Sequence, residues 1–191
     1  VCSSDLKPKV AFIVDIRRGA MLHHLLLKAL IELAPTRADF LSLLLSRARP
    51  AGLDTTTTID SMFRAFGTVR HDSALKAQTF AKVKDRLTKA HGFGLSEKDV
   101  GGMDWVFDAF YQAGPALTYS YGSNTGRGYG GRGGFGMPTY ESMLEATDAS
   151  GLRRSYLATE EGYRWLRDFE SRNIAASTSN SSGQTPLTMA R

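Results

Sequence analysis

The residues best suited to chemistry follow a short apolar run near the start of the chain. Five apolar residues, 10–14, precede Asp15, Ile16 and Arg17. Such a run predicts a strand that is buried on both faces and ends at the carboxylate. A carboxylate at the carboxyl end of a strand in an open α/β sheet suits the hydroxyls of a ribose. We therefore expect Asp15, with Ile16 and Arg17 beside it, to bind a nucleoside cofactor.

The charges around Asp15 also allow a purely structural interpretation. Asp15 can pair with Arg17, with Arg18 or with a neighbouring helix N-terminus. Guanidinium forks suit planar anions, so Arg18 is a candidate contact for a phosphate or carboxylate group of the substrate. A surface or inter-helix ion pair is the competing interpretation for both arginines, and the commoner arrangement.

A second set of candidates joins an expected extended segment, 154–158, to the start of a helix. Thr159 is an N-cap residue, and the acidic residues Glu160 and Glu161 that follow it suit the positive end of a helix dipole. Loops that end at a helix N-terminus often carry chemistry. We therefore take Tyr156 as a candidate for stacking on the substrate or for hydrogen bonding to it, and the two glutamates as weak candidates for a general base. A buried aromatic and simple dipole complements are the alternatives.

A glycine-rich loop holds the third set. Residues 122–136 contain eight glycines, with Arg127 and Arg132 placed among aromatic residues. Such a composition binds single-stranded nucleic acid through phosphate charge and base stacking, but two arginines would bind weakly and with strong salt dependence. A lid that brings both arginines to the substrate is the preferred interpretation, and a surface loop is the alternative.

The remaining ionisable pairs are less informative. Asp104 and Asp108 are four residues apart, so they share one helix face and could bind a cation or simply face solvent. The adjacent histidines at 23–24 point about 100° apart on a helix, and His71 and His91 have no ligand spacing. We therefore predict no metal site.

The elements that must position these residues are mostly helices. Apolar periodicity and start signals such as Thr36 with Asp39 and Ser96 with Asp99 predict a run of helices after the first strand. Their expected ranges are 19–33, 36–46, 59–66, 73–91, 97–113, 139–146 and 159–173. Short strands are expected over 117–121 and after residue 174. The sequence thus predicts an α/β fold, rich in helices and poor in strands, with the helices of about 36–113 inserted after the first strand.

Charge and composition narrow the partners. The net charge of +5 is a modest basic excess, weaker than that of a dedicated nucleic-acid binder. No apolar run approaches the length of a membrane span, so we expect no membrane partner. Residues 1–6, VCSSDL, have the look of a non-native adapter remnant, with a disordered native terminus as the alternative. Setting them aside removes Cys2, the only cysteine, and a reducing cytoplasmic setting is expected.

Several segments, taken in order, resemble an uncharacterised bacterial family of S-adenosylmethionine-dependent methyltransferase-like proteins. The segments are 7–18, 24–30, 47–53, 105–111, 114–115, 137–140, 146–148 and 154–161. The resemblance implies a single truncated Rossmann-like domain over 7–191. It also implies that Asp15 binds the ribose of S-adenosylmethionine, while a strand and glycine turn missing upstream hold the methionine part. The loop 122–136 is longer and richer in glycine than the family pattern, and 174–183 replaces a more apolar strand.

Three functions follow as hypotheses. The leading one is methyl transfer from S-adenosylmethionine to an unknown acceptor, with this chain as an inactive fragment. The second is a non-catalytic nucleotide- or RNA-binding protein that uses the arginine- and glycine-rich loop. The third is a scaffold of the same fold that binds no cofactor.

Overall fold

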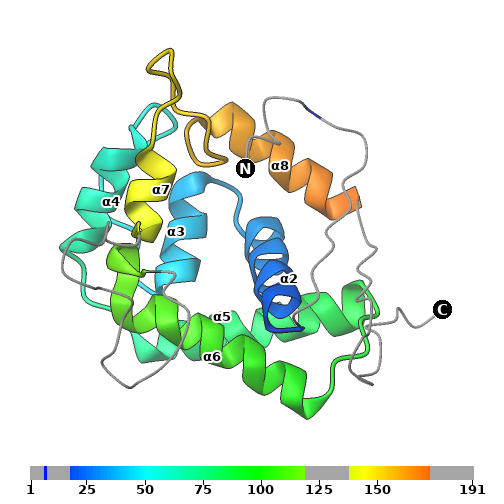
Figure 1. Ribbon diagram of the computed structural model, residues 1–191. Coiled ribbons are helices and arrows are strands. Elements are labelled where there is room, and N and C mark those ends of the chain that lie inside the picture. The colour runs from blue at the N-terminus through cyan, green and yellow to red at the C-terminus, as the bar shows by residue number, and fades with distance from the viewer. Residues whose placement is uncertain (1–6, 8–17, 119–137, 173–191) are drawn as a thin grey trace, which may run out of the picture.

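The computed structural model describes Lys7 and residues 18–118 and 138–172, and within them the chain is built from helices around the central helix α2 (Figure 1). Two of the helical segments are not α-helical: η1 is a π-helix and η2 a 3₁₀-helix. The elements are α2 (Arg18–Leu33), α3 (Arg37–Leu45), α4 (Ile59–Gly67), α5 (Ser73–Asp85), η1 (Arg86–Ala90), α6 (Glu97–Ala113), η2 (Gly114–Ala116), α7 (Tyr140–Glu145) and α8 (Glu160–Arg172).

The α/β fold class is wrong for this part of the chain, and no Rossmann-like sheet is present in it. Among the described residues, β-type pairing is limited to isolated bridges: Arg47 with His71, Thr118 with Thr139, and Thr147 with Arg153. The reason is physical. From residue 18 onward apolar residues recur at helical spacing, so most backbone groups of the described residues are satisfied inside helices.

The expected strands have different outcomes. The first strand, 10–14, and the segment after 174 lie outside the described residues, as do residues 119–121. The extended segment 154–158 forms turns instead of a strand, and the Ala158 amide donates to the Ser155 carbonyl at 2.9 Å. Leu117 offers its carbonyl to the Tyr140 amide at 2.7 Å, which joins η2 to α7 without a ladder.

The helix start signals of the sequence are confirmed. The Thr36 hydroxyl accepts a hydrogen bond from the Asp39 amide at 3.2 Å. The Thr139 hydroxyl accepts one from the Ser142 amide at 3.0 Å at the start of α7. Ser96 and Asp99 form a complete capping box at the start of α6. The expected helix over 73–91 is also present, but its last turn, η1, widens to π geometry. Such turns are rare and are often found at functional sites.

Helix α2 forms the centre of the core. Leu26, Ala29 and Leu30 are fully buried, and α2 packs against α3, α5, α6 and α8. The crossing with α6 is close because Gly102 has no side chain: a β-carbon there would lie 2.9 Å from Cδ1 of Leu22. None of the described helices combines the length and the apolar character needed to cross a membrane.

Candidate ligand-binding groove

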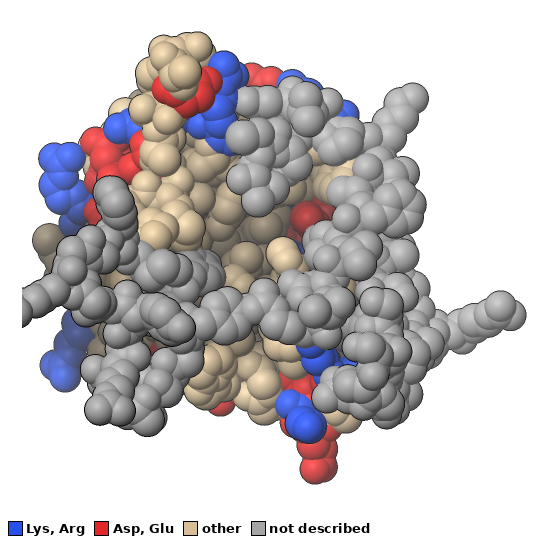
Figure 2. All heavy atoms as spheres, in the orientation of Figure 1, with Lys and Arg blue, Asp and Glu red and all other residues tan. Residues whose placement is uncertain are grey.

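A groove of about 430 Å³ opens between α2, α7 and the segment that connects α7 to α8. It lies on the face seen in Figure 2, which is hollowed there between mostly uncharged side chains. Apolar residues from all three elements form most of its wall, and the connecting segment adds polar side chains. The lining residues are Leu27, Tyr140, Met143, Leu144, Ala146, Thr147, Asp148, Arg154, Ser155 and Tyr156.

Two tyrosines meet inside the groove. The hydroxyl oxygens of Tyr140 and Tyr156 are 2.6 Å apart and share a hydrogen bond. Tyr140 is only 3% exposed, and its ring is held edge-on by Phe63 and Phe110, with centroids 5.9 and 5.2 Å away. The Tyr156 ring packs edge-on against Phe40 at 6.0 Å. Both phenol groups are therefore fixed in place before any ligand arrives.

The polar side chains that the connecting segment adds to the groove are also preorganised. Asp148 accepts a hydrogen bond from Nε of Arg154 at 2.8 Å, and its other oxygen accepts from the amides of Ser150 and Leu152. These bonds, led by that of Arg154, lower the pKa of Asp148. The Ser155 hydroxyl donates to the Leu144 carbonyl at 2.8 Å and so ties this segment to α7.

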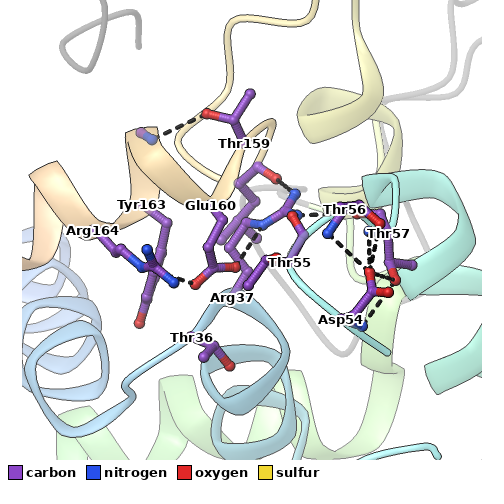
Figure 3. A network of polar contacts seen from close by, with 12 residues as sticks. Thr36, Arg37, Asp54, Thr55, Thr56, Thr57, Thr159, Glu160, Tyr163 and Arg164 are labelled. Carbon is purple, nitrogen blue, oxygen red and sulfur yellow. Dashed lines mark hydrogen bonds and ion pairs between the residues drawn. The ribbon is translucent and has the colours of Figure 1, made fainter. Parts of the chain in front are cut away.

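A buried arginine holds the neighbouring elements together behind this segment (Figure 3). Arg37, at the first position of α3, is 1% exposed. Its Nε donates to Oε2 of Glu160 at 3.1 Å. Its four remaining hydrogen bonds go to backbone carbonyls, those of Thr55, Thr57, Leu157 and Ala158. Because a guanidinium has five N–H groups, these five bonds satisfy Arg37 completely. We call Arg37, Glu160 and these carbonyls the Arg37 node.

The loop that offers two of these carbonyls is shaped by Asp54. One carboxylate oxygen of Asp54 accepts from the amides and hydroxyls of both Thr56 and Thr57, at 2.8 to 3.0 Å. These bonds, that of the Thr56 hydroxyl first, lower the pKa of Asp54. The tight turn they form holds the loop in the conformation that the node requires.

The glutamates expected as general bases have structural partners. Glu160 is buried against Arg37, with Nε of Arg164 3.9 Å from its second oxygen. Glu161 is exposed and lies 3.2 Å from Nζ of Lys7. Thr159 caps α8 by accepting from the Gly162 amide at 3.0 Å. The hypothesis of a general base therefore gains no support from this geometry, while the interpretation as a helix start does.

Arg18 forms an ion pair between helices, which was the alternative to its expected contact with the substrate. Its Nη2 lies 2.6 Å from Oδ2 of Asp99, and its Nε also donates to that carboxylate. Asp99 is 1% exposed and caps α6, so the pair joins the starts of α2 and α6. The hydrogen bonds from Arg18, followed by those from Ser96, lower the pKa of Asp99 to about 2.

The other predicted site residues lie outside the described part of the chain. Asp15, Ile16 and Arg17, expected to bind the cofactor, belong to this group. Arg127 and Arg132, expected to contact the substrate from a lid, belong to it as well. Both hypotheses therefore stay predictions. Tyr156 is the one candidate from the sequence that the structure places in the groove.

The remaining ionisable pairs are accounted for by ion pairs and packing. Asp104 and Asp108 share Lys76 of α5, at 3.3 and 2.9 Å. The rings of the adjacent histidines 23–24 stack at 6.1 Å. His71 packs on the Tyr111 ring at 4.3 Å. Within the described residues no group of histidine, cysteine and carboxylate side chains could hold a metal ion.

A buried charge cluster links α2 to α8 and to η1. Glu32 of α2 lies 2.9 Å from Nζ of Lys28 and 2.7 Å from Nε2 of His91, which follows η1. Lys28 also donates to the backbone carbonyl and the carboxylate of Glu170 in α8. Burial raises the pKa of Glu170. The cluster joins three helical segments and lies outside the groove.

Two residues of the site were missed at the level of sequence, although a signal existed for each. Arg37 stands three and four residues before Phe40 and Leu41, which places it on the buried face of its helix. Tyr140 stands four residues before Leu144 and shares its buried face in the same way. A charged or hydroxylated residue at an apolar helical position marks a buried polar contact.

Comparisons of the chain with protein-family models, with curated proteins and with solved structures give no match. The family resemblance drawn from the sequence motifs therefore stays a prediction.

Proposed function

We propose that the groove binds a small molecule through a flat aromatic group of about the size of a nucleobase. The observation that carries the proposal is the chemistry of the groove, a space of about 430 Å³ with mostly apolar walls whose lining includes the hydrogen-bonded Tyr140–Tyr156 pair. Mostly apolar concave sites with a few fixed polar groups are the usual ligand sites of proteins, with volumes of roughly 300–1,000 Å³.

The walls favour a flat ring over a flexible chain. Leu27, Met143 and Leu144 line the groove, and a flat ring packed against them would bury apolar surface without the loss of rotational freedom that a flexible chain suffers. A thioether next to an aromatic ring adds about 1 kcal/mol. Phenol hydroxyls both donate and accept hydrogen bonds, so the tyrosine pair suits the ring nitrogens or the exocyclic amine of a base.

The cofactor expected from the sequence belongs to this ligand class through its adenine ring. S-adenosylmethionine is therefore the first ligand to test, and methyl transfer to an unknown acceptor is the activity we would look for after binding. Free nucleotides and single-stranded RNA present the same flat bases and are the next ligands to test. A scaffold that binds no small molecule is the outcome if every titration fails.

The test is calorimetric titration of the 191-residue chain with S-adenosylmethionine and, separately, with adenosine. We expect saturable heat with a dissociation constant below about 1 mM for at least one of them. The Tyr156→Phe variant removes one hydroxyl and keeps the ring, so its affinity should fall by about threefold to tenfold.

Two glutamate substitutions make the test specific to the groove. Met143 is 39% exposed and lines the groove, whereas Leu152 is 52% exposed and does not. Met143→Glu should abolish binding because it places a carboxylate against the apolar walls. Leu152→Glu should leave it unchanged. The proposal would be refuted if none of the named ligands, free nucleotides and single-stranded RNA included, gave saturable heat. Equal losses of affinity in the two variants at equal thermal stability would refute it as well.

A further inference from the structure

Helices α5 and α6 pack against each other and leave a second groove, of about 410 Å³, between them. The two helices cross in the view of Figure 1. Phe80 and Val100 contribute apolar surface to it, and the exposed small residues Ala77, Ala81 and Gly101 keep it shallow. Trp105 stands one helical turn after the lining residue Gly101, on the exposed side of α6. It is 75% exposed, the largest exposure among the big apolar side chains of the described residues.

The two sides of the groove carry opposite charges. The α5 side carries Lys76 and Lys84, and the α6 side carries Asp104, with Asp108 one turn further along α6. Lys76 already pairs with both aspartates inside the chain. A surface that is basic on one helix and acidic on the next is complementary to a second copy of itself. The condition is that α5 of each copy faces α6 of the other.

We propose that the chain associates with a second copy through the α5–α6 face, each Trp105 packing on Ala77 and Ala81 of the other copy. The relation is a two-fold axis that lies in the interface along the groove. Such an axis sets α5 of one copy against α6 of the other, so the basic side meets the acidic side at both edges.

The register along the helices agrees with this pairing. Lys76 reaches Asp104 and Asp108, so this turn of α5 is level with the turn of α6 that holds Trp105. A rotation about an axis along the groove keeps that level. Trp105 therefore arrives opposite Ala77 of the second copy, where no large side chain stands in its way, and Lys76 arrives opposite the second pair of aspartates.

The expected association is weak. Two shallow helix seams bury less surface than the roughly 800 Å² per partner of a stable standard interface. One tryptophan from each copy would contribute most of the contact, as buried aromatic residues commonly do. Association should weaken with added salt, because the charged edges stay near solvent.

Sedimentation equilibrium of the 191-residue chain, from about 10 to about 500 µM, is the first test, because the expected dissociation constant of so small an interface lies in this range. We expect a reversible monomer–dimer equilibrium. The Trp165→Phe variant leaves Trp105 as the only tryptophan, because the chain has two. Its emission should shift to shorter wavelength over the same range of concentration as the dimer forms.

Two single substitutions decide whether this face is the interface. Ala77→Glu introduces a bulky charge at an exposed helical position opposite the expected site of Trp105, so it should leave the helical circular dichroism unchanged and raise the dissociation constant at least tenfold. Leu152→Glu places a charge at another exposed apolar site and should not change the dissociation constant of the dimer. A chain that stays monomeric throughout, or an Ala77→Glu variant that dimerises like the unsubstituted chain, would overturn the proposal.

Discussion

Arg37 and Glu160 are 123 residues apart in the sequence, and their side chains meet at 3.1 Å in the interior of the domain. The guanidinium also donates hydrogen bonds to backbone carbonyls of the loop at 55–57 and of the segment before α8. One side chain thereby fixes how α3, that loop and α8 lie relative to one another. The segment that carries Tyr156 into the groove is anchored at the same point.

Glu160→Gln should destabilise the domain strongly. It leaves the charge of Arg37 buried without its carboxylate, and losing one partner of a buried pair costs about 3 kcal/mol or more. Glu161→Gln is the matched control, because Glu161 is exposed and its pair with Lys7 contributes at most about 1 kcal/mol. Urea denaturation of both variants measures the difference in the free energy of unfolding. Equal losses of unfolding free energy in the two variants would show that the Arg37–Glu160 ion pair does not stabilise the domain.

Two adjacent glycines of α6 should respond in opposite ways to alanine. A β-carbon on Gly101 meets nothing within 4 Å, so Gly101→Ala should stabilise the helix by about 0.5–1 kcal/mol. A β-carbon on Gly102 meets Leu22 at 2.9 Å, and displacing that side chain should cost about 1 kcal/mol or more. Thermal unfolding at low protein concentration compares the two. A stabilising Gly102→Ala would show that α2 and α6 can separate freely.

Gly114→Ala should destabilise the junction between α6 and η2. Gly114 has a φ of +59°, and its β-carbon would lie 2.7 Å from Nη2 of Arg47. Arg47 in turn donates from Nη1 to the Phe66 carbonyl at 2.7 Å and holds the end of α4. We expect a loss of about 2 kcal/mol from backbone strain alone and more from the displaced arginine.

Gly52→Ala provides the control for that change. Gly52 also has a positive φ, +78°, but its β-carbon would meet nothing within 4 Å. Its substitution measures the cost of the backbone conformation without a steric contact. The difference between the two unfolding free energies, measured in urea, therefore reports on Arg47, and a difference near zero would mean that the guanidinium moves aside at no cost.

Stability should fall as the pH is lowered from 7 to 4, in part because of His23. Burial, with a smaller contribution from the charge of His24, lowers the pKa of His23 from 6.5 to about 4. Between these values the unfolded chain takes up a proton that the folded chain does not, so the unfolded state gains at most about 3 kcal/mol. His23→Leu should flatten the dependence of the unfolding free energy on pH in this window. His24→Gln should largely keep it, since His24 is exposed. A His23→Leu profile parallel to the unsubstituted one would assign the acid sensitivity to other groups.

Helix positions could be predicted from local chemistry. The range 97–113 coincides with α6 because its start signal, Ser96 with Asp99, is formed by neighbouring residues. Such capping contacts depend on three or four consecutive residues, so the sequence contains all the information they need. The same holds for Thr36 and Thr139.

The fold class could not be predicted from neighbouring residues in this way. A strand needs a partner, and the segment 154–158 has none among the described residues, so it turns back on itself. The groove combines Leu27 with Tyr140 and Tyr156, and each tyrosine lies more than 100 positions after Leu27 in the sequence. No periodicity reports such a meeting. Only the packing of α2 against the later helices brings these residues together.

The Arg37 node also has a consequence for the order of folding. Its hydrogen bonds to the Leu157 and Ala158 carbonyls join residues 120 and 121 positions apart, so closing the node requires nearly the whole domain to be assembled. Contacts of such long range slow folding, because a large loop must close before they form. Helix α8 should therefore dock after the transition state, and substitutions at the node should act mainly by accelerating unfolding. The lifetime of the folded domain would then be controlled by the node that anchors the groove.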